Sequence, residues 1–105
     1  MGLLDFLSGT VKAGMDKMND MYIEKIYESY KKFRYDSNYE LEELINNVDQ
    51  SSLKIAIIFA ISERDLNTGI RIAKNFDISK TTFAKFISHP EMKNIAREII
   101  TNWGN

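Results

Sequence analysis

Apolar side chains recur every three or four residues through the first third of the chain, and this spacing restricts that segment to an α-helix. The mean step is close to the helical repeat of about 3.6 residues, whereas a strand alternates every two. Residues 1–36 are therefore predicted to form one long amphipathic helix, with residues 3–8 as a separate short turn because Gly9 and Gly14 weaken the first turns. The stripe consists of Leu4, Leu7, Val11, Met15, Met18, Tyr22, Ile26, Tyr30 and Phe33.

The remainder, residues 37–105, is predicted to be a helical core. Ser37 and Glu40 have the spacing of a capping box, in which each side chain binds a free amide of the first helical turn. The segment from Leu53 to Ile61 is apolar nearly all round. Its composition also suits a buried strand, but its neighbours are helical and no partner strand is visible, so we interpret it as a central helix running to about Arg64.

Three further helices are expected after this central segment. Residues 65–69 are predicted to be a connecting loop, followed by helices at about 69–76 and 79–88. The last helix is expected to open at Ser88 and Glu91, with Pro90 in its first position and Gly104 ending it. The predicted fold class is thus all-α, a single domain with a compact bundle of about five to six helices.

Composition narrows the classes of protein to which the chain can belong. At 105 residues, 44% of them hydrophobic, it has the size and apolar content of one globular domain. The absence of cysteine excludes disulfides, zinc–thiolate sites and thiol catalysis, and fits a reducing compartment, so a cytoplasmic location is expected. No apolar run is long enough to span a bilayer, and no secretory signal is evident.

Charge is distributed unevenly along the chain, although the net charge is only −1. Residues 1–69 carry 8 basic and 12 acidic side chains, whereas residues 70–105 carry 6 basic and 3 acidic ones. The C-terminal third is therefore mildly basic, which favours an acidic partner for that part of the chain.

Residues 69–88 have the residue spacing of two short helices that cross steeply. A small residue is needed at the crossing, where Ala73 stands, and Ser79 is placed to cap the second helix. The stretch resembles the helix-turn-helix of bacterial DNA-binding regulators, particularly the LacI-type pattern A-x-x-x-G-V-S-x-x-T-V-S-R. It departs from that pattern at Asp77, which stands where the left-handed turn residue is usually Gly. The apolar positions between the helices are Ile72, Phe76, Ile78, Phe83 and Phe86.

This resemblance implies double-stranded DNA as the partner, with the second helix in the major groove. Lysines would mainly contact phosphates, and threonines would contact base edges or thymine methyl groups. The DNA-binding residues it implies are Arg71, Lys74, Ser79, Lys80, Thr81, Thr82, Lys85 and Ser88. In the alternative interpretation, residues 69–88 are two ordinary core helices with lysines on a solvated face.

The N-terminal helix supports a second hypothesis, a protein-binding module such as an immunity protein, an inhibitor or an adaptor of a phage or mobile element. The opening Met-Gly-Leu-Leu-Asp-Phe-Leu is similar to the start of many short helical proteins of that origin. Packing against the rest of the domain is the first interpretation of the apolar stripe, and a homodimer through this helix is the next. The protein-binding candidates, acidic and tyrosine side chains on one side, are Asp16, Asp20, Glu24, Tyr27 and Glu28.

Catalytic and metal-binding patterns are missing from the sequence. His89 is the only histidine and, beside Pro90, is expected to mark the start of a helix. No Glu-x-x-His pair indicates a metal site, and no glycine-rich loop indicates a phosphate cradle. We therefore expect a binding protein that is not an enzyme and needs no metal or other cofactor.

Overall fold

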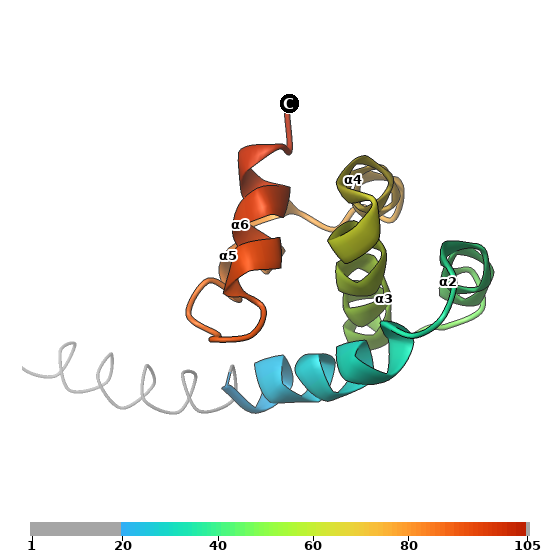
Figure 1. Cartoon of the computed structure of the whole chain (residues 1–105), viewed down its shortest axis with the longest axis horizontal. Helices are drawn as coiled ribbons and strands as arrows, with labels where there is room; N and C mark the ends of the chain where they lie inside the picture. The colour runs from blue at the N-terminus through green and yellow to red at the C-terminus, as the bar shows by residue number, and fades with distance from the viewer. Residues whose placement is uncertain (1–19, 105) are drawn as a thin grey trace, which may run out of the picture.

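A buried helix, α3 (Ser51–Arg64), lies at the centre of the computed structural model, which describes residues 20–104. Every side chain from Ile55 to Ile61 is at most 3% exposed, so the segment that is apolar all round is covered all round. Its neighbours are a helix over residues 20–33, α2 (Asn38–Ile45), α4 (Leu66–Asn75), α5 (Lys80–Ala84) and α6 (Lys93–Thr101) (Figure 1). Over residues 20–104 there are six helices and no strand, which confirms the predicted all-α bundle.

The helix over residues 20–33 packs its apolar stripe against this core. Ile26 and Tyr30 are buried, and Tyr22 and Phe33 are half-buried. The helix ends at residue 33, and residues 34–36 form a turn, so the predicted end at residue 36 is wrong. The earlier part of the predicted helix, including the turn at residues 3–8, lies outside the described residues.

A polar contact fixes the same helix to the end of α3. The hydroxyl of Tyr30 donates a hydrogen bond of 2.7 Å to Oε2 of Glu63, which also binds Arg34 at 3.0 Å. Burial, together with the hydrogen bond to the Glu63 carboxylate, raises the pKa of the Tyr30 phenol well above its ordinary value. The phenol therefore stays a neutral donor in the folded protein.

The capping box before α2 is confirmed. The amide of Glu40 donates to Oγ of Ser37 at 3.1 Å, and the amide of Ser37 donates to the Glu40 carboxylate at 3.4 Å. α2 then buries Leu41 and Ile45 and contacts α3. One face of this short helix thus covers one side of α3.

The predicted loop at residues 65–69 is wrong, because Asp65 alone separates α3 from α4. Its carboxylate accepts from the amide and the hydroxyl of Thr68, at 3.2 Å and 2.7 Å, and so caps α4 one turn before the predicted start. These hydrogen bonds hold the pKa of the Asp65 carboxyl below its usual range. Gly69 lets the two helices approach closely, since a Cβ on it would lie 3.0 Å from Cα of Ser62 and would overlap the Ser62 hydroxyl.

The last two helices are shorter than predicted. α5 ends at Ala84 instead of residue 88, and residues 85–88 continue as turns. α6 begins at Lys93, so Pro90 is not in its first turn. The Nδ1 atom of His89 caps the turn that leads into α6, because it accepts from the amides of Glu91 and Met92 at 3.1 Å and 3.3 Å. The helix itself begins only at Lys93, so the prediction that His89 marks the start of a helix is wrong. Ser88 and Glu91, the predicted opening of the last helix, both lie before the first residue of α6, so that prediction is also wrong.

Candidate nucleic-acid interface

The turn between α4 and α5 has a left-handed residue at Asp77, whose φ is 58°. The amide of Ile78 donates to the carbonyl of Ala73 at 2.9 Å, and the amide of Asp77 donates to that of Lys74 at 3.1 Å. These two bonds are those of a Schellman motif, which ends a helix and redirects the chain. The backbone at Asp77 thus adopts the conformation for which the DNA-binding pattern usually uses Gly.

Apolar side chains fill the space between α4, α5 and the central helix. Ala73 and Phe83 are fully buried, as is Phe86 in the turns after α5. The ring of Phe59 in α3 meets Phe83 and Phe86 edge-on, with centroids 5.5 Å and 4.8 Å apart. These contacts fix how α5 is presented to solvent.

Three exposed polar side chains lie on the outward side of α5 and at its C-cap: Lys80, Thr81 and Lys85. Thr82 is half-buried. Ser79 occupies the N-cap position, but its hydroxyl is hydrogen-bonded to the hydroxyls of Thr81 and Thr82, at 2.8 Å and 3.3 Å. The prediction that its side chain caps α5 is therefore wrong. Five of the predicted DNA-binding residues therefore lie together on α5 and its two caps: Ser79, Lys80, Thr81, Thr82 and Lys85.

Two other predicted DNA-binding residues are bound within the fold. Nη2 of Arg71 lies 3.2 Å from the carboxylate of Glu42 in α2. Nζ of Lys74 donates to the carbonyl of Trp103 at 2.6 Å and lies 5.4 Å from the centre of its ring. Ser88 is exposed but lies beyond the end of α5. These long-range pairings, 29 residues apart in both cases, carry no local sequence signal.

A hollow of about 360 Å³ lies directly beside α5. One side is formed by the α4–α5 turn together with Thr82 and Lys85, and the other by Tyr22, Ser51 and Ile55. The helix over residues 20–33 and the start of α3 therefore lie across this hollow from Thr82 and Lys85.

The predicted protein-binding residues are partly occupied by contacts within the fold. Oε1 of Glu24 lies 3.0 Å from Nε2 of His89, and Oε1 of Glu28 lies 3.0 Å from Nζ of Lys31. The ring of Tyr27 packs on His89, with centroids 4.6 Å apart. Asp20 is exposed, and Asp16 lies outside the described residues.

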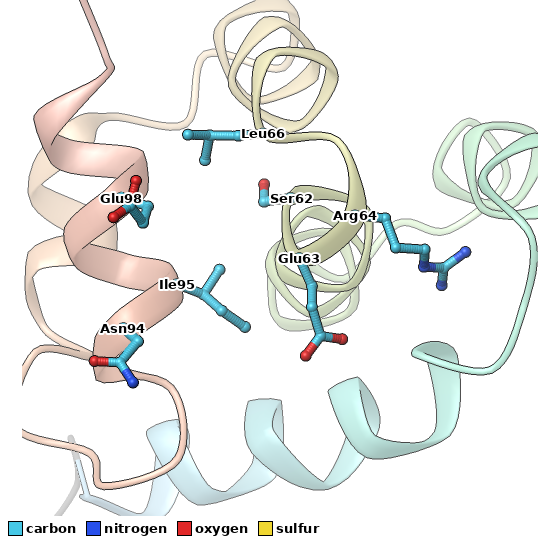
Figure 2. A pocket seen from close by; sticks show the side chains of 7 residues that line it. All are labelled: Ser62, Glu63, Arg64, Leu66, Asn94, Ile95 and Glu98. Atoms are coloured by element: carbon cyan, nitrogen blue, oxygen red, sulfur yellow. The ribbon is translucent and has the colours of Figure 1, made fainter.

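A second hollow, of about 320 Å³, lies on another face of the bundle, between the end of α3, the start of α4 and α6. Leu66 and Ile95 line it, and Asn94 and Glu98 of α6 border it (Figure 2). The Arg64 side chain points away from it toward α2. The buried hydroxyl of Ser62 has no hydrogen-bond partner, but it points at Gly69 across the helix crossing. This hollow is thus mostly apolar and has no converging donors.

Neither a metal site nor a membrane-spanning helix is present in the part of the chain that the structure describes. Residues 20–104 contain no group of three or more His, Asp or Glu side chains placed to hold an ion. No helix among them is long and apolar enough to cross a bilayer. No family model, curated protein or solved structure shows significant similarity to the chain.

Proposed function

We propose that the chain is a small DNA-binding protein, a regulator or accessory factor, that places α5 in the major groove of double-stranded DNA. The observation that carries this proposal is the turn at Asp77, with its Schellman hydrogen bonds and a φ of 58°. It joins two helices at the position where the resembled motif turns, and the helix that follows has a polar, exposed outer side.

The chemistry of that outer side suits a duplex. Lys80 and Lys85 are cations that can neutralise phosphates, and Thr81 offers a hydroxyl and a methyl group to base edges. α5 has no Arg, Asn or Gln for bidentate contacts to a base. We therefore expect phosphate contacts to dominate its affinity, with modest sequence preference.

Fluorescence anisotropy with a labelled duplex tests this function. Affinity is expected to fall steeply as salt is raised from 50 to 200 mM, on the order of tenfold or more, because phosphate contacts release counterions. K80E/K85E should abolish binding at 50 mM salt, whereas K25E/K32E changes the charge equally on the exposed side of the helix over residues 20–33 and should retain most of it.

Two results would remove the proposal. One is the absence of binding to any duplex at low salt by folded protein. The other is an equal loss of binding in K80E/K85E and in K25E/K32E, which would show only a general effect of net charge.

A protein partner is the second candidate function, favoured by exposed aromatic side chains in one short segment. Tyr35 and Tyr39 are 84% and 75% exposed and stand on either side of the α2 cap. Tyrosine is enriched at protein interfaces because it offers both an apolar ring and a hydroxyl. A partner retained by the wild type in a pull-down from the native host, and lost by Y35A/Y39A, would support this function; equal retention by both would oppose it.

A further inference from the structure

Three basic residues of the described chain form ion pairs with carboxylates, and the others, which include Lys25 and Lys32, do not. Three cations toward its N-terminal side bind carboxylates at 3.0 to 3.2 Å: Lys31 with Glu28, Arg34 with Glu63 and Arg71 with Glu42. Among residues 20–104, none of the four cations from Lys80 onward makes such a pair. These are Lys80 and Lys85 at α5 and Lys93 and Arg97 in α6, and all four are exposed.

The two α6 cations lie on one flank of their helix. Lys93 and Arg97 are four residues apart, so they stack on the same side one turn apart. A different flank of α6 faces the apolar hollow shown in Figure 2, and it carries Asn94, Ile95 and Glu98. The flank with the cations is therefore turned away from that hollow.

α5 lies on that other side. It contacts α6 and lies behind it in Figure 1, the view in which the hollow faces forward. Packed helices have axes about 8–10 Å apart, and the major groove is about 12 Å wide. When α5 lies in the groove, a helix packed beside it is placed over the groove's edge, where the phosphates are.

We propose that Lys93 and Arg97 form a second anchor on DNA, one that binds backbone phosphates beside the groove occupied by α5. The inference rests on the proposed function and adds an element that the resemblance over residues 69–88 does not include. This anchor is expected to raise the affinity for DNA without changing the sequence preference, because every base pair has the same phosphates. The exposed acids Glu91 and Glu98, close in sequence to Lys93 and Arg97, reduce the positive field at this flank.

The test measures the slope of log Kobs against log salt concentration for K93A/R97A, using the full chain and one 20-base-pair duplex. Each lost phosphate contact lowers the slope by about 0.9, so the double variant should lose about 1.8. K25A/K32A removes two equally exposed cations from the helix over residues 20–33 and should leave the slope unchanged. Circular dichroism checks that each variant is folded, which is expected because both substitutions are at exposed sites.

The outcomes separate the anchor from the function on which it rests. A reduced slope in K80A/K85A with an unchanged slope in K93A/R97A overturns the anchor alone. Failure of the wild type to bind at 50 mM salt overturns both. A K93A/R97A variant that weakens binding to one duplex but not to another of unrelated sequence would show base contacts and would also overturn the phosphate anchor.

Discussion

Nε2 of His89 lies 3.0 Å from a carboxylate oxygen of Glu24, although 65 residues separate the two in sequence. The Nδ1 atom of the same ring accepts two amide hydrogens, so the neutral ring carries its proton on Nε2 and donates it to Glu24. Tyr27 packs on the ring from the side. One buried side chain thus joins the helix over residues 20–33 to the segment that leads into α6.

Replacing His89 by Ala is expected to lower the free energy of unfolding by about 2 kcal/mol, since two amides near the buried Met92 lose their acceptor. E24A should cost less than about 1 kcal/mol, because the Glu24 side chain is 60% exposed and its charge interactions are screened. Urea denaturation of the two variants measures the difference. Equal losses would show that the contact to Glu24, and not the cap, accounts for the role of His89.

The crossing of α3 and α4 should tolerate a smaller residue at Ser62 but no larger residue at Gly69. G69A is expected to destabilise the protein by about 2 to 3 kcal/mol, because its Cβ meets both the side chain and Cα of Ser62. S62A should be neutral or slightly stabilising, since the buried Ser62 hydroxyl has no partner to lose. In a double-mutant cycle, S62A should recover part of the loss caused by G69A; strict additivity would mean that the two residues do not meet.

Alkaline pH should destabilise the protein through Tyr30. Because the pKa of this phenol is raised in the folded state, its contribution to stability is complete below the unfolded value of about 10. Above that pH the unfolded chain loses the proton while the folded protein retains it, so the free energy of unfolding falls. Y30F lacks this group, and its urea midpoint should fall less between pH 8 and pH 11 than that of the wild type. Parallel falls would contradict the assignment.

Asp77 should be replaceable by Gly with a gain in stability. A φ of 58° costs a residue with a side chain more than it costs glycine, so D77G is expected to raise the free energy of unfolding by about 1 kcal/mol. D77N keeps a residue that tolerates the left-handed region and removes only the charge. Both variants should bind DNA at least as tightly as the wild type. A loss of stability in D77G would mean that the carboxylate, and not the backbone, fixes this turn.

Local chemistry made much of the fold predictable. The capping box at Ser37 and Glu40 and the apolar run around Ile57 each depend on neighbours in sequence, and both are present as predicted. The start of α4 is less predictable: Asp65 and Thr68 have capping spacing, but Gly69 one residue later is typical of a loop. Gly69 instead allows α3 and α4 to approach closely, a role that only the packed structure reveals.

The candidate site was less predictable because its neighbours come from distant parts of the chain. The left-handed turn at Asp77 follows from the local pattern, as do the buried Phe83 and Phe86. The carbonyl that binds Lys74 and the carboxylate that binds Arg71 are brought close only by tertiary packing. No periodicity or motif marks such contacts, so these two cations could not be separated from Lys80 and Lys85 by sequence alone.

The all-round burial of α3 has a consequence for how the protein opens. Residues Ile55 to Ile61 are at most 3% exposed and belong to a core cluster to which every other described helix contributes, so opening one outer helix alone should not expose them all. Their amide hydrogens should exchange with deuterium only when the whole structure unfolds. The slowest-exchanging amides of this helix therefore report the global stability directly, while faster exchange in α5 would report local opening of the surface proposed to meet DNA.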